Sequence, residues 1–291
     1  MLKIDNLEKT YPGNVRALQG VSLDIAPGLF GLLGPNGSGK STLMRTLATL
    51  QSPDRGTVTF AGRDIFQHAQ THRRLLGYLP QEFGVYPGVS AERLLDHLAV
   101  LKGLTHVRQR REQIHALLEK TNLYPVRKKA VSTFSGGMRR RFGIAQALLG
   151  DPRLIIVDEP TAGLDPEERH RFHDLLAAVG ERVVVVLSTH IVEDIRRLCS
   201  RMAVLHEGRV QAIGEPERLV RVLDGKIWQR TVPRGELGAF RERFQVLSTQ
   251  LLAGRTQIRV LADDCPDPGF APFSPSLEDV YFSALGQNPA A

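Results

Sequence analysis

The segment "GPNGSGKST", residues 34–42, restricts the fold of this chain more than any other stretch. It fits the pattern G-x-x-x-x-G-K-[ST], follows the apolar run "GLFGLL" and precedes the helical pattern "STLMRTLATL". A strand, a glycine-rich loop and a helix in this order form a phosphate-binding loop, because glycines let backbone N–H groups turn toward an anion and the helix N-terminus adds partial positive charge. The sequence therefore predicts that a phosphate chain is bound by Gly34, Pro35, Asn36, Gly37, Ser38, Gly39, Lys40, Ser41 and Thr42.

Three side chains of this loop have distinct expected roles. We expect Lys40 to reach the β- and γ-phosphates of a nucleotide, and the Ser41 hydroxyl to bind Mg²⁺. Thr42 would support the phosphate from the next helical turn. The alternative is a glycine-rich turn that carries a lysine by chance, and the flanking strand and helix patterns argue against it.

Two carboxylates and a histidine follow the other apolar runs. Asp158 and Glu159 come directly after "LIIV", and His190 closes "VVVVLSTH". Because ligands lie beyond the carboxyl ends of parallel strands, we expect Asp158 to orient the water shell of Mg²⁺. Glu159 is the candidate general base for an attacking water, and His190 would donate to the γ-phosphate and hold that water. Taken alone, the Asp-Glu pair would be a surface turn and the histidine a structural residue.

The apolar pattern predicts an α/β fold. The runs "GLFGLL", "LIIV" and "VVVVL" are continuous, as in strands that are buried on both faces of a parallel sheet, whereas "LKIDNLEKTY" and "VSLDI" alternate as antiparallel strands do. Helical spacing replaces strand signals from "SAERLLDHLAVLKGL" onward. We therefore predict an α/β core with an antiparallel β edge at residues 1–215, with a helical subdomain inserted at about 88–150, and an accessory domain at 216–291.

The accessory domain has an α+β pattern of its own. Ile227–Val232 is expected to be a strand, Glu236–Arg243 a helix, and "QVLSTQLL" and "TQIRVLA" two strands joined by "AGR". In the final helical segment, "SLEDVYFSALG", Ser276 and Asp279 would form a capping box and Gly286 would end the helix. These signals predict a small α+β appendage.

Composition leaves the partner open. The formal charge of +7 and the pI near 9.7 suit a nucleotide, a nucleic acid or an anionic membrane surface. No apolar run approaches the roughly 18 residues that span a bilayer, and "MLKIDNLEK" lacks the core of a signal peptide, so we expect a cytosolic chain. Cys199 and Cys265 form no CxxC pair and support neither a disulfide framework nor a metal knuckle.

Taken together, the motifs resemble those of the ATP-binding cassette (ABC) ATPases. Besides the phosphate loop, "YLPQE", "FSGGM", "LIIVDEP", "AGLD" and "STH" occur in the order and approximate spacing of that family, over roughly residues 1–215. A phosphate loop alone would also allow kinases, GTPases and helicases, but a kinase would have no use for "FSGGM". The resemblance implies a P-loop NTPase core, ATP and Mg²⁺ as ligands, and ATP hydrolysis.

The resemblance also implies roles for three further residues. Gln81 in "YLPQE" is similar to the Q-loop glutamine, which touches the metal or the attacking water; a polar residue capping the turn after Pro80 is the alternative. Tyr11 in "EKTYPG" is placed like the adenine-stacking aromatic of the family, or it ends an edge strand. Asp165 in "AGLDP" resembles the D-loop aspartate that contacts the site of the opposite subunit, or it is a helix N-cap.

Cassettes of this family pair head to tail, and this pairing gives "FSGGM" a function. The segment of one chain closes over the ATP that the phosphate loop of the other holds, so Ser135, Gly136 and Gly137 would face the γ-phosphate bound by a second copy of the chain. The usual family pattern is LSGGQ. Phe134 keeps the apolar anchor at the first position, whereas Met138 removes the amide of the glutamine at the last.

The resemblance further implies a transport motor. One cassette without membrane helices, followed by a tail that resembles those of drug-export ATPases, predicts a separate integral membrane permease and a location at the cytoplasmic face of the cell (inner) membrane. We expect the permease to dock beside Gln81, along Glu82 to Ser90, where Phe83 and Tyr86 suit an interface or pack locally.

A non-transport ABC ATPase that acts on nucleic acid or ribosomes is the alternative, and the basic pI is compatible with it. Ribosome-acting chains usually hold two cassettes, and DNA-repair types insert coiled coils or cysteine-rich zinc elements before the SGG motif. The sequence has neither feature, so no nucleic-acid partner is expected.

Overall fold

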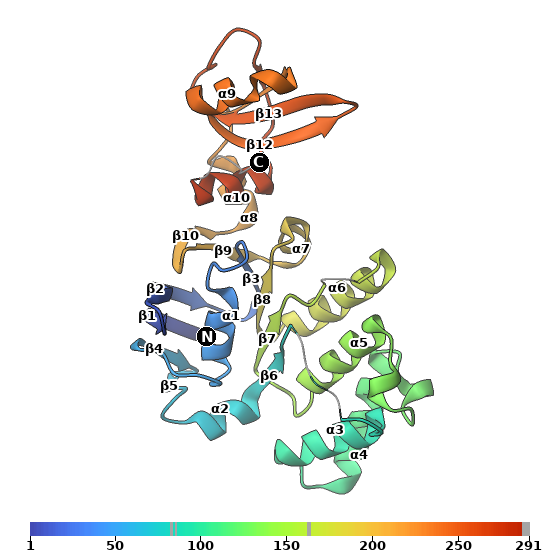
Figure 1. Cartoon of the computed structure of the whole chain (residues 1–291). Coiled ribbons are helices and arrows are strands. Elements are labelled where there is room, and N and C mark those ends of the chain that lie inside the picture. The colour runs from blue at the N-terminus through green and yellow to red at the C-terminus, as the bar shows by residue number, and fades with distance from the viewer. Residues whose placement is uncertain (82–83, 85, 162–163, 287–291) are drawn as a thin grey trace.

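A computed structural model describes residues 1–81, 84, 86–161 and 164–286 of the chain. Its strands form three sheets, and helices lie on both sides of the largest one (Figure 1). Within the described ranges, no helix is long and apolar enough to cross a membrane.

The largest sheet has the strand order β10-β9-β3-β8-β7-β6, and all its neighbouring pairs are parallel except β9 with β10. Its strands are β3 (Gly28–Leu33), β6 (Leu76–Leu79), β7 (Leu154–Asp158), β8 (Val184–Thr189), β9 (Arg201–His206) and β10 (Arg209–Gly214). β3, β7 and β8 contain the three continuous apolar runs, so the prediction of buried parallel strands is confirmed. Because the three strands are parallel neighbours, the segments that follow them emerge at one edge of the sheet.

Side-chain alternation divides the core into two layers on the two faces of this sheet. In β7, Leu154 and Ile156 belong to one layer, whereas Ile155 and Val157 belong to the other. The first layer also contains residues of α1, and the second contains residues of α5, α6 and α7. The helices around the sheet are α1 (Lys40–Leu47), α2 (Ala69–Leu75), α5 (Gly136–Ala147), α6 (Pro166–Gly180) and α7 (Val192–Leu198).

The alternating segments near the N-terminus form a separate antiparallel sheet of order β2-β1-β4-β5. Its strands are β1 (Leu2–Tyr11), β2 (Val15–Ile25), β4 (Arg55–Phe60) and β5 (Arg63–Asp64). Leu2 and Ile4 of β1 are buried together with the α1 residues Leu43 and Met44, so this sheet covers α1 from outside. The antiparallel strands are thus a layer of their own, and the antiparallel edge of the parallel sheet is β10.

The predicted helical subdomain consists of α3 (Ala91–Leu101), α4 (Val107–Lys120), two short 3₁₀ turns, Tyr124–Val126 and Val131–Thr133, and α5. Ser90 caps α3, since its side chain accepts a hydrogen bond from the Arg93 backbone N–H at 3.4 Å. The arginine run before the core of α4 is divided: Arg108 pairs with Glu112 at the surface, whereas Arg110 is largely buried and pairs with Asp96 at 2.6 Å.

The C-terminal strands form a third sheet of order β12-β13-β11-β14. Its elements are β11 (Ile227–Val232), a 3₁₀ turn at Arg234–Glu236, α9 (Leu237–Arg243), β12 (Gln245–Leu252), β13 (Arg255–Leu261) and β14 (Ala271–Pro272). The sheet has a small core of its own, formed by Val232, Phe240, Val246, Ile258, Val260 and Phe270. The expected strands and helix are confirmed here, and β14 is an addition.

The last helix, α10 (Leu277–Leu285), lies between this sheet and the cassette-like part of the chain (Figure 1). The predicted capping box of Ser276 and Asp279 is present, and Gly286 ends the helix in the left-handed conformation. α10 packs against α7, β9 and β12, and against the preceding helix α8 (Pro216–Arg221). One hydrophobic core therefore continues from the parallel sheet into the appendage.

A substitution at Gly77 in β6 can test how closely the end of α5 must approach the parallel sheet. A Cβ at this position would lie 2.1 Å from the backbone oxygen of Ala147, at the end of α5. Gly77→Ala is therefore expected to lower the free energy of unfolding by roughly 1–3 kcal/mol, because the helix end must shift. Urea denaturation measures this change. Gly238→Ala is the control, since no described atom lies within 4 Å of its Cβ position apart from its chain neighbours and the backbone of its own helix. Equal unfolding midpoints for the two variants would contradict the close approach.

Candidate active site

The phosphate loop connects β3 to α1 and is fixed by its glycines. Gly37 and Gly39 have φ values of +80° and +106°, which side chains other than glycine rarely adopt. A Cβ at Gly39 would lie 2.3 Å from the Ala17 backbone oxygen, and one at Gly34 would lie 2.4 Å from that of Leu205. The loop is thus held between β2 and β9. The Ser38 hydroxyl is buried in it with no hydrogen-bond partner among the described residues.

Lys40 begins α1, and only 4% of its surface is exposed. Its ammonium donates hydrogen bonds to the backbone oxygens of Gly34, at 2.7 Å, and Pro35, at 3.0 Å. It also lies 3.8 Å from Oε1 of Glu159. Burial lowers the pKa of Lys40, although the carboxylates of Glu159 and Asp158 oppose that shift. A desolvated ammonium inside an N–H-lined loop interacts strongly with a phosphate, because little water screens the attraction.

Asp158 and Glu159 end β7 beside β8. The Ser188 hydroxyl donates a hydrogen bond to Asp158, and the Glu159 N–H donates to the Ser188 backbone oxygen at 3.0 Å. Glu159 has a φ of +47°, in the left-handed region that a non-glycine residue adopts only at a cost of order 1–3 kcal/mol. The bonds to β8 compensate for this strain. The sequence analysis did not single out Ser188, although a polar residue at the end of an apolar strand is a signal that could have found this partner of Asp158 and Glu159.

The three residues expected to be catalytic meet at one carboxylate. Oε2 of Glu159 accepts a hydrogen bond from Nε2 of Gln81 at 3.3 Å and lies 3.4 Å from Nδ1 of His190. Its other oxygen faces Lys40. Glu159 is largely buried, whereas about half of the His190 side chain is exposed. The site therefore has a carboxylate that can accept a proton, flanked by donors that can orient a water.

Tyr11 lies beside the end of the phosphate loop. Its hydroxyl donates to Oε1 of Gln51 at 2.8 Å and lies 3.5 Å from the Thr42 hydroxyl. Gln51 in turn donates to the backbone oxygen of Thr42 at 3.1 Å. The structure thus brings Tyr11, from another sheet, to the end of the phosphate loop, and its role in stacking on a base stays a prediction.

The remaining predicted residues lie at the starts of two other helices. Ser135 and Gly136 are exposed, and Ser135 caps α5 by accepting from the Met138 N–H at 3.2 Å. Asp165 caps α6 by accepting from the Glu168 N–H at 2.8 Å, as the helix-cap alternative requires. Phe134 is buried against Phe142, which anchors the segment. Figure 1 places α5 and α6 on the opposite side of the parallel sheet from α1.

Several residues of the predicted motifs lie outside the described residues. These are Glu82, Phe83 and Val85 of the expected docking segment, and Ala162 and Gly163 of "AGLD".

The chain is similar to known proteins in sequence and in fold. The family model "ABC transporter" matches residues 18–162. The Nod factor export ATP-binding protein I of Paraburkholderia xenovorans (strain LB400) is 38% identical over 221 residues, covering 75% of this chain and 72% of that protein. The linearmycin resistance ATP-binding protein LnrL of Bacillus subtilis (strain 168) is 35% identical over 227 residues, covering 77% and 72%.

A solved structure matches as well. The ATP-binding cassette MJ0796, in a dimeric post-hydrolysis state bound to ADP and Pi, superposes with a TM-score of 0.68 at 27% identity, covering 74% of this chain and 98% of that one. The chain belongs to the family of ABC transporter ATP-binding proteins. Its nucleotide is ATP, and its reaction is ATP hydrolysis.

Because Lys40, His190 and Gln81 all lie at the carboxylate of Glu159, we expect hydrolysis to depend on that carboxylate. Glu159→Gln keeps the shape of the side chain but cannot accept a proton, so turnover should fall about 100-fold to 10,000-fold while ATP still binds. Phosphate release measures turnover, and a fluorescent ATP analogue measures binding. Lys40→Ala provides the contrast, because it should abolish binding itself. Normal phosphate release by Glu159→Gln would show that Glu159 is not the base.

Proposed function

We propose that this chain is the motor subunit of an ABC exporter: two copies bind ATP between them, drive a separate membrane permease, and separate after hydrolysis. The observation that carries the proposal is the division of the site. Lys40, His190 and Gln81 gather around the carboxylate of Glu159, while the exposed Ser135 and Gly136 begin a helix on the other side of the sheet. A single chain therefore presents half of two sites. The names of its relatives, which refer to export and resistance, support the direction of transport.

Within one half-site, each residue has a separate task. Glu159 takes the proton of the attacking water, and His190 and Gln81 hold that water and the γ-phosphate in line with it. Lys40 and the loop N–H groups stabilise the negative charge that develops on the phosphate oxygens. Tyr11 stacks on the adenine.

Mg²⁺ fits the oxygen donors of Ser41, Asp158 and Gln81. The described residues contain no cluster of three or more His, Cys, Asp or Glu side chains for a metal, and a magnesium ion that shares ligands with nucleotide phosphates needs none. The Ser188 hydroxyl orients the Asp158 carboxylate from one side. When bound, the ion neutralises phosphate charge.

The second half of each site comes from the partner copy. The free N–H groups at the start of α5, with Ser135, Gly136 and Gly137, face the γ-phosphate held by the opposite phosphate loop. Asp165, at the start of α6, contacts the same opposite site. Met138, which follows the glycines, lacks the side-chain amide of the usual glutamine. This segment therefore binds through its backbone and through Ser135.

Mixed dimers test the shared site. Lys40→Ala destroys the phosphate loop of its chain, whereas Ser135→Arg blocks only the segment offered to the partner. Each variant alone should be inactive. Mixed at equal amounts, about half of the dimers pair one of each and hold one intact site, so activity should recover to about a quarter of wild type.

Unchanged dimerisation and hydrolysis by Ser135→Arg alone would contradict the shared site. No recovery in the mixture would do so as well, provided that mixed dimers form. Differently tagged chains and tandem purification establish that they do.

A permease helix would dock in a groove between the sheet and the helical subdomain. Its lining includes Tyr78, Pro80, Leu98 and the exposed side chains of Leu50 and Leu101, of which 63% and 71% are accessible. The groove lies next to Gln81, so a force on it reaches the carboxylate of Glu159 through one hydrogen bond. We assign residues 1–215 to the cassette and 216–291 to an accessory domain, with the complex at the cytoplasmic face of the membrane.

The groove makes a specific prediction. Leu101→Glu replaces one of the two exposed leucines of the groove, whose lining also contains Arg73, Arg74 and Lys102, with a charged side chain. It should prevent co-purification of an integral membrane permease, while basal ATPase activity is retained. Leu252→Glu is the matched control, because Leu252 is also an exposed leucine, 59% accessible, on the hairpin of the C-terminal sheet. Mass spectrometry of the detergent-solubilised complex identifies the partner. Loss of the permease only with Leu252→Glu would move the docking surface to the accessory domain.

A further inference from the structure

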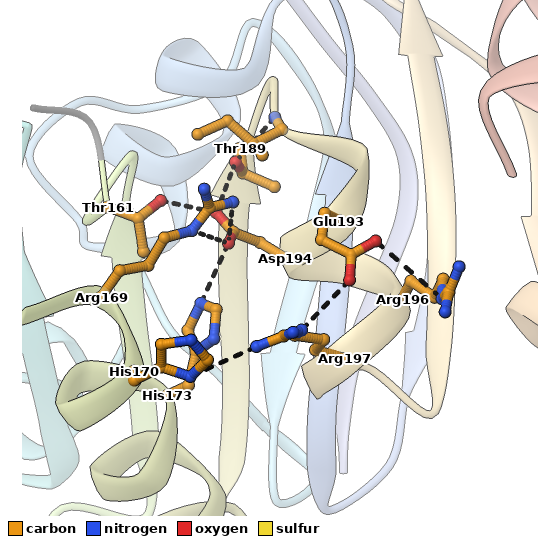
Figure 2. Close-up of polar contacts among 10 residues, drawn as sticks. Thr161, Arg169, His170, His173, Thr189, Glu193, Asp194, Arg196 and Arg197 are labelled. Carbon is orange, nitrogen blue, oxygen red and sulfur yellow. Dashed lines mark hydrogen bonds and ion pairs between the residues drawn. The ribbon is translucent and has the colours of Figure 1, made fainter. Parts of the chain in front are cut away.

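A buried carboxylate lies next to the segments that carry Glu159 and His190. Asp194, in α7, has 0% of its surface exposed. Its carboxylate is surrounded by donors from three separate segments: the turn after β7, the end of β8, and the first two turns of α6 (Figure 2). No motif of the sequence analysis includes Asp194, and the proposed catalytic steps do not use it.

The two oxygens of Asp194 have different partners. Oδ1 accepts from the Arg169 guanidinium, at 2.6 and 2.8 Å, and faces Nε2 of His173 at 2.9 Å. Oδ2 accepts from the hydroxyl of Thr161 at 2.5 Å and lies 3.4 Å from that of Thr189. Since a carboxylate can only accept, all these groups point their protons at it, and each is fixed in orientation.

The charge of Asp194 is retained despite its burial. Burial raises the pKa of the carboxyl, but the hydrogen bonds from His173, Thr161 and Arg169 outweigh it and hold the pKa below its ordinary value. Arg169 supplies the opposite charge, at 2.6 Å. The second ring nitrogen of His173 is buried without a partner among the described residues, so Asp194 supplies the hydrogen-bond contact of this ring. A carboxylate that is satisfied in this way is rigid.

The threonines connect this carboxylate to the active site. Thr161 is two residues after Glu159, and Thr189 directly precedes His190. The Thr189 hydroxyl also accepts from the Ile191 N–H at 3.0 Å, which fixes the chain on both sides of His190. We infer that Asp194 is a positioning residue: by holding Thr161 and Thr189 together, it sets the distance between Glu159 and His190, on which water activation depends. This role rests on the proposed function of those two residues.

A second route leads from Asp194 toward the partner's site, and it is weaker. Arg169 belongs to α6, where the preceding residue, Glu168, forms an ion pair with Arg141 of α5 at 3.1 Å. A Cβ at Gly137 would lie 3.2 Å from Glu168, so α6 also touches the "FSGGM" segment. The side chains of this pair are largely buried, at 19% and 17% exposed, but the pair is linked to Asp194 only through the backbone of α6, whereas Thr161 and Thr189 face the carboxylate itself. The direct bonds to the threonines are buried, so Asp194 acts on the site of its own chain.

The first test compares binding with turnover. Asp194→Asn keeps the shape but replaces one carboxylate oxygen with an NH₂ donor. Because Arg169 can only donate, the amide oxygen should stay at Arg169 and the NH₂ group should face the threonines, which then lose their common acceptor. Turnover should fall about tenfold or more, while the ATP affinity stays within about twofold of wild type, because a small displacement of reacting groups affects rate more than binding. Glu193→Gln, next to it on α7, removes a carboxylate whose pairs with Arg196 and Arg197 are exposed, and should change neither.

A second pair of variants covers the case in which Asp194→Asn does not fold. Thr161→Val removes the hydroxyl and keeps the shape, whereas Thr161→Ser keeps the hydroxyl. The valine variant should lose turnover while its ATP affinity is kept, and the serine variant should retain turnover. Wild-type turnover in both Asp194→Asn and Thr161→Val would overturn the inference, and so would an equal loss in the two Thr161 variants.

Mixed dimers separate the two routes. In the pair of Lys40→Ala with Ser135→Arg, the working site uses the catalytic residues of the Ser135→Arg chain and the "FSGGM" segment of the other. Asp194→Asn should lower the recovered activity about tenfold or more when it is in the Ser135→Arg chain and leave it unchanged in the Lys40→Ala chain. Equal loss from both placements would overturn the positioning role at its own site.

Glu159→Gln, placed in the same two chains, reports on the proposed function separately. Loss only from the Ser135→Arg chain supports the shared site whatever Asp194→Asn does. If Glu159→Gln shows no difference between the chains, the shared site is wrong, and the Asp194 inference is then decided by the turnover of the Asp194→Asn and Thr161 variants alone.

Discussion

The parallel pairing of β3, β8 and β7 is the constraint on which the rest of the structure depends. Leu33 pairs with Thr189, and Asp158 pairs with Ser188, so the three strands end side by side. The phosphate loop, the Asp158–Glu159 turn and His190 are far apart in sequence, and this register alone brings them to one edge. A slip of one residue would turn each of these strand ends to the opposite face of the sheet. The apolar strands therefore determine the relative positions of the site residues as well as the stability of the core.

Electrostatic compensation at this edge follows from the same constraint. The Lys40 ammonium and the carboxylates of Asp158 and Glu159 are all largely buried, and each is held by hydrogen bonds. Glu159 adopts a left-handed backbone that is unfavourable on its own. Its neighbours on β8 make this conformation the stable one. The site is thus held ready by the fold, with the carboxylate already between Lys40 and His190.

The sequence predicted those parts of the molecule whose signals are local. The continuous runs of β3, β7 and β8, the glycine-rich loop, the Ser90 cap and the capping box of Ser276 are each set by a few adjacent residues, and the structure confirms them. Roles for Glu159, His190 and Gln81 were predicted because these residues lie at strand ends or in a motif. Their meeting at one carboxylate is a finding of the structure.

Features that depend on contacts between residues far apart in the chain could not be predicted from the sequence. Alternation in β1 and β2 indicates a half-buried antiparallel pair, but it does not say whether that pair extends the parallel sheet or forms another layer. Ser188 and Thr161 look like ordinary polar residues after a strand, and Asp194 looks like a charge on a short surface helix. Only tertiary packing shows that Asp194 is buried and accepts from both threonine segments. The packing of α10 between the appendage and α7 is of the same kind.

The central claim is that one chain's "FSGGM" segment covers the phosphate loop of another, and cross-linking tests it most directly. Asn36→Cys is placed in one chain and Gly136→Cys in a second, both positions being exposed, with Cys265 replaced by Ser and Glu159→Gln added to prevent turnover. A short bismaleimide should join the two chains when ATP is present and should not do so with ADP or without nucleotide. No cross-link with ATP, or equal cross-linking in all three conditions, would contradict the shared active site.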